Sequence, residues 1–307
     1  YTSLEDIITL AYGVNAKSGF ARRFWNFCSR YMVKHDNLIV KAVENLLESI
    51  KKPYFIYIHL MNTHMPYYPV HEFFVKTLVR DYVYYNMLIA PWSKRFDIYT
   101  LGKDVFTPHQ LRYLNSTYDV TVKGLDRTVE KIVNLFDEDT LFILTADHGE
   151  NLGEYHKLGH KLCYYDTLIW VPLMIRHTGI TPSRIECMFE TRHIFHLILD
   201  YVKKGLLTIN GSDYVYGEGM EVFEKYKMFR RIEKNMPYSG RYLRTKKLKY
   251  IRYDNGKEEL YRVNGKESRI HSTEALNAMR ALLKVKEREV FRNKLKRIVL
   301  NNHIARM

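Results

Sequence analysis

Cysteine is scarce in this sequence, and its scarcity excludes two ways of stabilising a domain. The 307 residues include three cysteines, Cys28, Cys163 and Cys187, and no C-x-x-C pair. A disulfide framework or a cysteine zinc site needs more cysteines at shorter spacings, so we expect three free thiols. Long apolar runs are also lacking, because no stretch reaches the roughly 18–20 residues that a membrane-spanning helix needs. We therefore predict no transmembrane segment and a cytoplasmic setting, with an extracellular one open if a signal was lost upstream.

An excess of charge is missing from most of the chain. Residues 1–220 contain 24 Lys and Arg against 24 Asp and Glu, whereas residues 221–307 contain 24 against 10. The formal net charge of +14 therefore arises in the last stretch alone. Such a segment is either a solvated basic surface, which we favour, or a surface that binds phosphate, nucleic acid or acidic lipid. Because the chain contains no nucleic-acid motif, we do not expect nucleic acid as its partner.

The sequence alternates helical and strand-like patterns. Residues 35–52 place apolar residues at helical spacing, and residues 53–62 ("PYFIYIHLMN") follow as a dense apolar run typical of a buried strand. Residues 107–136 predict the clearest helix, with Thr107 as N-cap and Pro108 at the first helical position. Two more buried strands are expected at 140–146 and 166–176. This alternation indicates an α/β sheet covered on both faces.

Two other stretches have a different pattern. Residues 70–105 are aromatic and irregular, and we interpret them as an insertion. Residues 240–263 predict short strands with a hairpin at "DNG", and a basic helix is expected over about 273–300. We therefore divide the chain into an α/β core over 1–235, incomplete at its N-terminus, and a small basic subdomain of β-sheet and helix over 236–307.

Polar residues that can carry chemistry follow the predicted strands. Asp147 and His148 come directly after the strand at 140–146, where ligands bind in α/β sheets, and an Asp–His pair can ligate a divalent metal. A helix-capping Asp beside a surface His is the alternative. Histidines also mark the end of the 53–62 run, at His59 and His64. The glycine-punctuated loop before the third strand adds four more candidates: His156, Lys157, His160 and Lys161. Together they are suited to holding a metal and a tetrahedral oxyanion.

Four segments in this order resemble the later part of sulfatase-family enzymes of the alkaline phosphatase superfamily. They are "FIYIHLMNTHMPYYP", "YDVTVKGLDRTVEKIVNLF", "FILTADHGENLGEYHKLGHKLCYYDTLIWVPLMI" and "GRYLRTKKLKYIRYDNGKEELYRV". The third contains the D-H-G-E-x-x-G-E signature and the V-P-L-[IM]-I strand after it. The resemblance implies a three-layer αβα sandwich of alkaline phosphatase/sulfatase type, followed by a small C-terminal antiparallel sheet with a helix.

The resemblance also implies roles for individual residues. Asp147 and His148 match the metal ligands, for one divalent ion that we expect to be Ca²⁺, with Mg²⁺, Mn²⁺ or Zn²⁺ as alternatives. His64 matches the histidine that contacts the sulfate or phosphate group. His160 matches a position that binds or protonates the leaving-group oxygen, and Lys161 is an alternative for that role and for substrate binding. A further set is expected around the site, more as structural than as chemical groups: His59, Glu150, Glu154 and His156.

One departure from the family matters. Sulfatases take their nucleophile from the Cys or Ser of a C-x-P-x-R or S-x-P-x-R element, and related phosphatases use Ser or Thr there, but no cysteine of this chain fits that element. No early strand ends in the Asp-Asp pair that completes the family's metal site. We therefore expect a catalytically incomplete chain that represents the C-terminal portion of a hydrolase. A truncation is favoured over a half of a complex or a degenerate homologue retained for binding, and an exposed sheet edge would favour self-association.

The expected activity of the intact protein is metal-dependent hydrolysis of a sulfate or phosphate ester, with a small-molecule or glycan ester as substrate. The alternatives are a phosphodiesterase or phosphoglycerol transferase of the same superfamily, or a non-catalytic protein that binds an acidic polymer through its basic tail. Sulfate and phosphate are both tetrahedral oxyanions, so these residues do not separate the chemistries.

Overall fold

The computed structural model describes residues 35–64, 67, 99, 104–160, 163–219 and 239–304, with the backbone alone at 35–38 and 294–304. The chain divides into two compact units, which are described separately. Unit 1 comprises residues 1–160 and 171–181, and unit 2 comprises residues 161–170 and 182–307. Most of the predicted insertion at 70–105 lies outside the described residues, and so does Lys161.

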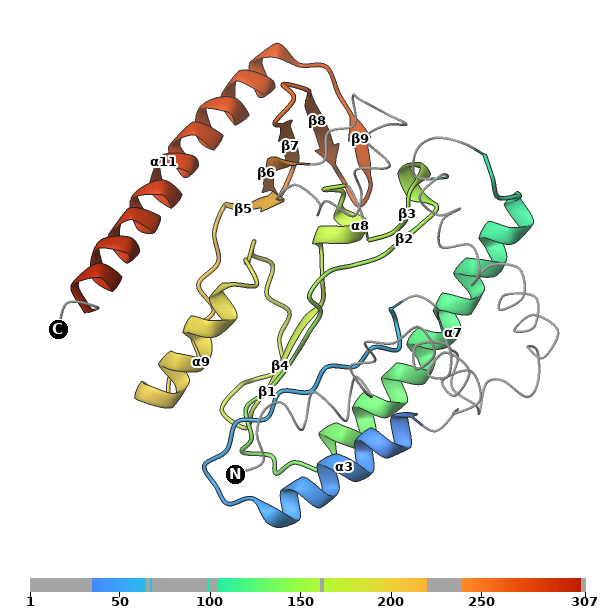
Figure 1. Ribbon diagram of the computed structural model, residues 1–307, viewed down its shortest axis with the longest axis vertical. Coiled ribbons are helices and arrows are strands. Elements are labelled where there is room, and N and C mark those ends of the chain that lie inside the picture. Colours follow the sequence, from blue (N-terminus) through green and yellow to red (C-terminus); the bar gives the residue numbers. More distant parts are fainter. Residues whose placement is uncertain are drawn as a thin grey trace. The chain divides into compact units, whose positions relative to one another are not determined.

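Within its described residues, unit 1 contains two long helices and short strands (Figure 1). Its elements are α3 (His35–Ser49), α7 (Pro108–Val133), β1 (Phe142–Thr145), β2 (Asn151–Leu152), the 3₁₀ turn η3 (Glu154–His156), β3 (Leu158–Gly159) and β4 (Leu173–Arg176). β1 pairs with β4 in an antiparallel ladder, and β2 pairs with β3 as a short hairpin. Most of the residues that the sequence marks as functional lie beside these two ladders: Asp147 and His148 follow β1, and Glu150 and His160 flank the β2–β3 hairpin.

The helix α7 begins where its capping residues predict. The side chain of Thr107 accepts a hydrogen bond from the backbone N–H of Gln110, whose side chain accepts one from the backbone N–H of Thr107. Pro108 occupies the first turn, where no N–H is needed. The only glutamine of the chain thus closes a capping box. This confirms the predicted start of the helix.

One side of α7 packs into the core of unit 1. Its buried residues recur every three or four positions, as a helix facing a core requires: Tyr113, Leu114, Thr117, Thr121, Gly124, Thr128 and Ile132. Buried threonines satisfy their hydroxyl groups by donating to the carbonyl one turn earlier, as Thr121 does to Thr117. The core continues through Tyr67, Tyr99, Phe106 and Leu158.

Two predictions of strands in unit 1 need correction. No strand is assigned over 53–62 within the described residues, and exposure alternates along this segment, with Phe55 at 68% and Tyr57 at 55%. The apolar run is therefore extended but not buried on both sides. The expected strand over 166–176 is also shorter, because α8 (Asp166–Ile169) precedes β4 and ends before Pro172. Strong β-propensity here is overridden by a helical turn.

Unit 2 is built around a five-stranded antiparallel sheet in the order β5-β6-β7-β8-β9. Its described elements are α8, α9 (His193–Lys204), β5 (Tyr214–Gly219), β6 (Gly240–Thr245), β7 (Leu248–Tyr253), β8 (Glu258–Val263), β9 (Glu267–Arg269) and α11 (Thr273–Ile304). The "DNG" hairpin lies between β7 and β8, as predicted. β5 precedes the predicted boundary at residue 236 and pairs with β6, so this sheet takes one strand from the segment assigned to the core.

Both faces of this sheet are covered. Leu243, Tyr250 and Leu260 pack against Met279 and Leu283 in the first part of α11, and the helix continues beyond the sheet (Figure 1). Alternate residues point the other way, where Ile251, Tyr253 and Tyr261 pack against Tyr164. The predicted antiparallel sheet with a helix is confirmed. No described helix is long and apolar enough to cross a membrane.

Candidate functional site

The β2–β3 hairpin sets the geometry of the candidate site. Asn151 and Gly159 are cross-strand partners, so Glu150 and His160 extend the hairpin by one position on each strand. The buried side chain of Asn151 donates its amide to the Gly159 carbonyl at 2.7 Å. From α7, the side chain of Asn115 donates to the Leu152 carbonyl at 2.8 Å. The hairpin is therefore fastened both within itself and to the long helix.

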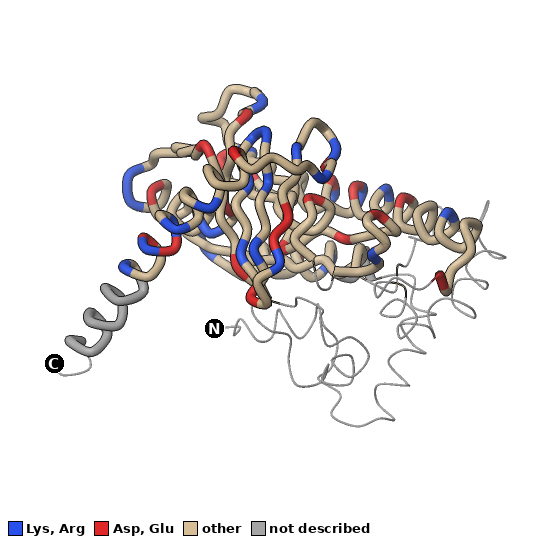
Figure 2. The backbone as a smooth tube through the Cα atoms, turned by 90° about the horizontal axis from the view of Figure 1, so that it is seen from above, with Lys and Arg blue, Asp and Glu red and all other residues tan. Residues whose placement is uncertain are grey.

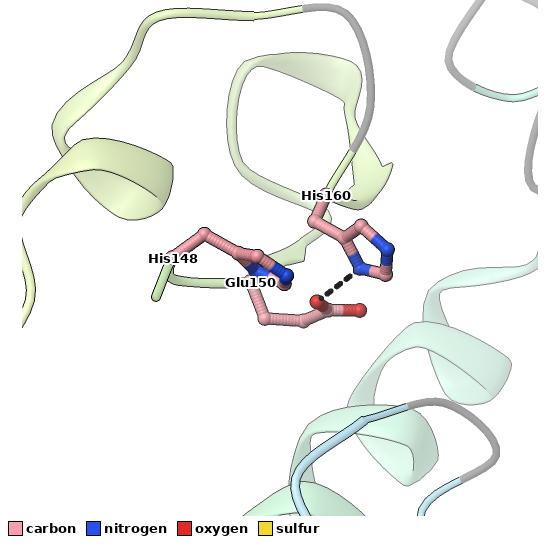
Figure 3. A group of neighbouring side chains, drawn as sticks. All are labelled: His148, Glu150 and His160. Atoms are coloured by element: carbon pink, nitrogen blue, oxygen red, sulfur yellow. Dashed lines mark hydrogen bonds and ion pairs between the residues drawn. The ribbon is translucent and has the colours of Figure 1, made fainter. Parts of the chain in front are cut away.

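Glu150 and His160 meet directly. Oε2 of Glu150 lies 2.9 Å from Nδ1 of His160, and the Glu150 side chain is only 4% exposed (Figure 3). The other carboxylate oxygen, Oε1, accepts a hydrogen bond of 2.7 Å from the hydroxyl of Tyr67. Both oxygens of this buried acid are thus satisfied, as a buried charge requires.

Two further histidines surround His160. The ring of His148 stacks on that of His160 with centroids 4.4 Å apart, and the ring of His64 lies 5.0 Å from it. Nδ1 of His148 lies 2.8 Å from the carbonyl of Gly149. This carbonyl can only accept, so Nδ1 carries the hydrogen and Nε2 presents a lone pair. One nitrogen from each of His148 and His160 and one oxygen of Glu150 lie within 4.8 Å of one another, so this group could hold a metal ion.

Asp147 adjoins this group from the end of β1. Its Oδ1 accepts the backbone N–H of His148 at 3.0 Å, and its Oδ2 lies 3.7 Å from Nε2 of His148. The Asp147 side chain is 65% exposed, so the carboxylate faces solvent beside the imidazole. An oxygen and an unprotonated nitrogen at this separation fit two positions of one coordination sphere. Two protein ligands alone would hold an ion weakly.

The other expected residues have different surroundings. His59 is half-buried, and its ring centroid lies 6.1 Å from that of Tyr57. Within the hairpin, the carboxylate of Glu154 accepts a hydrogen bond of 2.7 Å from the backbone N–H of Leu152. His156 stacks on Tyr99 with ring centroids 3.9 Å apart. The expected structural roles of these three residues stay predictions. Lys161 lies outside the described residues, so its predicted role stays a prediction.

Sequence reasoning placed Glu150 around the site without naming its partner, and it did not single out Tyr67. The structure shows that Glu150 contacts His160, while its expected structural role stays a prediction. The available signal was its spacing: Glu150 and His160 flank the short glycine-containing segment "NLGEYHKLG", which a hairpin can fold back on itself. Nothing in the sequence pointed to Tyr67, because its contact depends on how the segment before it packs.

Comparison with known proteins gives partial matches. Over 75 residues, the chain is 35% identical to the multifunctional alkaline phosphatase superfamily protein PehA of Trinickia caryophylli. The aligned region covers 23% of this chain and 14% of PehA. The phosphonate monoester hydrolase of Silicibacter pomeroyi superposes with a TM-score of 0.48 at 21% identity, covering 66% of this chain and 47% of that structure. A putative sulfatase of Bacteroides thetaiotaomicron VPI-5482 superposes with a TM-score of 0.46 at 16% sequence identity. The match covers 67% of this chain and 47% of that structure.

The chain thus spans less than half the length of these relatives. The family described as Sulfatase matches residues 12–204, which include α7, the hairpin and every residue of the candidate site. The family match agrees with the predicted fold class of alkaline phosphatase/sulfatase type, and the described residues show its C-terminal antiparallel sheet with a helix. The chain belongs to the sulfatase family of the alkaline phosphatase superfamily.

Proposed function

We propose that the protein containing this chain is a metal-dependent hydrolase of sulfate or phosphate esters. One observation carries the proposal: Asp147 and His148 place an oxygen and a ring nitrogen 3.7 Å apart at the end of β1, beside the ring of His160, whose centroid lies 4.4 Å from that of His148. Members of this superfamily use divalent metals. Asp147 and His148 would hold the ion, which when bound stabilises negative charge on the ester oxygens.

The remaining residues would act on the substrate. His64, exposed and 5.0 Å from the His160 ring, can donate a hydrogen bond to a non-bridging oxygen of the ester. His160 can give a proton to the departing alcohol oxygen through Nε2, because Nδ1 is engaged by Glu150. Lys161 is the alternative donor that the resemblance implies. The nucleophile is not among the residues assigned here.

The choice of metal follows from the donor set. Ca²⁺, which the resemblance favours, prefers oxygen ligands, whereas imidazole suits Zn²⁺ and Mn²⁺. A site with His148 in it therefore calls for a direct comparison of these ions. All of these ions bind carboxylates such as Asp147. Removing His148 should therefore weaken the binding of Zn²⁺ or Mn²⁺ more than the binding of Ca²⁺, and this difference discriminates between the ions.

The test uses the complete gene product that contains this chain. After removal of metals with a chelator, Ca²⁺, Mn²⁺ or Zn²⁺ is returned singly, and release of 4-nitrophenol is followed from its sulfate, phosphate monoester, phosphate diester and phenylphosphonate esters. We expect turnover that returns with one ion and falls at least about 100-fold in His148→Ala. His196→Ala, at an exposed position on α9, is the matched control and should retain activity. Absence of metal-dependent turnover on all four esters would refute the proposal.

A second candidate, binding of an acidic polymer, has one supporting observation. Lys284, Arg288 and Arg292 are exposed one turn apart along α11. Figure 2 shows, however, that acidic residues accompany the basic ones along this helix. Arg280 pairs with Glu258 and Lys286 with Glu289, so part of the positive charge is neutralised. Binding to heparin that weakens steeply with salt, without ester turnover, would favour this candidate instead.

A further inference from the structure

We propose that Glu150, held by Tyr67, is a positioning residue that fixes the tautomer and orientation of His160 for proton transfer. The inference rests on the proposed function for its catalytic meaning, and on the hydrogen bonds of the hairpin for its geometry. It assigns to the last residue of the D-H-G-E sequence a role distinct from metal binding.

The burial of Glu150 is the first argument. A carboxylate that is 4% exposed is costly to keep in a protein interior unless both oxygens are hydrogen-bonded. Oε1 accepts from Tyr67, which is itself fully buried and packed edge-on against Tyr118 with ring centroids 5.1 Å apart. Burial raises the pKa of the Tyr118 hydroxyl, and the nearby Glu150 charge adds to the effect. Such an environment holds the carboxylate in one place.

The hairpin register is the second argument. Because Asn151 pairs with Gly159, the chain brings Glu150 opposite His160 without relying on long flexible segments. The Asn151 side chain locks that register through its bond to the Gly159 carbonyl. The 2.9 Å contact between Glu150 and His160 is therefore built into the local fold.

The chemical consequence concerns the two ring nitrogens of His160. An ionised carboxylate only accepts hydrogen bonds, so Nδ1 of His160 must carry the hydrogen. Nε2 is then the nitrogen that can take up or release a proton, as in other carboxylate–histidine pairs. Direct coordination of one metal by both Glu150 and His160 would require this hydrogen bond to break. Bonds to both Glu150 oxygens favour positioning over coordination.

The first arm of the test reads the tautomer without any activity. The gene product, labelled with ¹⁵N-histidine and stripped of metal, is examined by long-range ¹H–¹⁵N correlation at a pH where the ring is neutral, and His160→Asn assigns the signal. We expect Nδ1–H for His160 in the wild type and in Glu150→Gln, whose amide oxygen can still accept. In Glu150→Ala we expect a shift to Nε2–H, while Glu138→Ala, an exposed acid, changes nothing.

Tyr67→Phe separates the two halves of the arrangement. It removes the hydroxyl that holds Oε1 but leaves the Glu150–His160 contact, so the Nδ1–H signal should persist with broader lines. A wild-type His160 in the Nε2–H form, or a tautomer unchanged in Glu150→Ala, would overturn the proposal. So would loss of the Glu150–His160 hydrogen bond when one equivalent of diamagnetic Zn²⁺ is added.

The second arm compares leaving groups. If His160 protonates the departing oxygen, Glu150→Ala should lower kcat about 100-fold for an alkyl ester, which needs that proton. For the 4-nitrophenyl ester, which needs it little, the loss should stay below about threefold, and Glu150→Gln should recover part of the alkyl activity. Equal losses on both esters would show a structural role only. If no ester is hydrolysed, the proposed function fails, whereas the tautomer still decides the role of Glu150.

Discussion

Asn151 and Gly159 are joined twice, as cross-strand partners of β2 and β3 and through the Asn151 side-chain amide, which donates to the Gly159 carbonyl at 2.7 Å. The ladder has only two residue pairs, too few to be stable alone. The additional hydrogen bond, made by a fully buried side chain, therefore contributes much of the local order. Glu150 and His160 follow directly on either side of this pair.

Replacing Asn151 with Ala should weaken both stability and the site. Loss of the amide leaves the buried Gly159 carbonyl without that donor, which costs about 1–3 kcal/mol of unfolding free energy. The contact between Glu150 and His160 should loosen as well. Urea unfolding measures the first effect, and the ¹⁵N tautomer of His160 measures the second. Asn293→Ala, exposed on α11, is the control and should unfold like the wild type.

Gly153→Ala tests the turn that closes the hairpin. Gly153 has φ +120°, where an L-residue is strained although a Cβ would meet only Leu111 at 3.9 Å. We expect a loss of about 1–3 kcal/mol from backbone strain alone. Gly205→Ala, at the end of α9 with φ +66° and no atom within 4 Å of the added Cβ, should also lose stability in the same urea experiment, because only the backbone is strained there. An unchanged unfolding free energy in both variants would contradict the attribution to backbone conformation.

The capping box of α7 predicts a measurable coupling. Thr107→Ala should cost about 1 kcal/mol, because the side chain no longer accepts the N–H of Gln110. Gln110→Ala removes the reciprocal bond. Because the two bonds share the same pair of residues, the double variant should lose less than the sum of the single losses. A double-mutant cycle by urea unfolding measures this, and strict additivity would argue against a closed box.

Local signals explain which parts of the fold could be predicted. The start of α7 and the hairpin at 254–256 depend on residues that are neighbours in the chain, and the sequence predicts both. The run at 53–62 has the composition of a buried strand, but burial depends on what covers each face, and Phe55 is exposed. The apolar composition of residues 53–62 is therefore compatible with burial, but it does not determine whether other elements cover the segment.

In the candidate site, too, the sequence predicts what depends on neighbouring residues and does not predict contacts that depend on packing or strand register. Asp147 and His148 follow β1, and their adjacency to His160 and His64 agrees with the expectation that strand ends gather chemical groups. Their roles as metal ligands, and those of His64 and His160 toward a substrate, stay predictions. Glu150 acquires its partner through the register of a hairpin, which periodicity does not specify.

A buried charge network in unit 2 gives the next prediction. Nζ of Lys249, on β7, donates to Glu267 at 2.6 Å and to Asp166 at 2.9 Å, and the Lys249 side chain is fully buried. Lys249→Met leaves two acids without their shared partner, so we expect a loss of about 3–5 kcal/mol. Lys204→Met, which breaks an exposed pair with Asp200 on α9, should leave the unfolding midpoint almost unchanged. Similar midpoints for both variants would refute a structural role for the network.

Asp166 makes part of this network dependent on pH. Burial acts to raise the pKa of Asp166, but Lys249 and the hydrogen bonds from Arg244 outweigh it and hold the pKa below the ordinary value of 3.8. A carboxyl whose folded-state pKa is lowered contributes stability above its unfolded-state pKa and loses it as pH falls through the folded-state pKa. The difference in unfolding free energy between wild type and Asp166→Asn should thus be largest near neutral pH and shrink below about pH 4. Urea unfolding at a series of pH values measures this difference, and a gap that stays constant down to pH 3 would show that Asp166 acts through its shape rather than its charge.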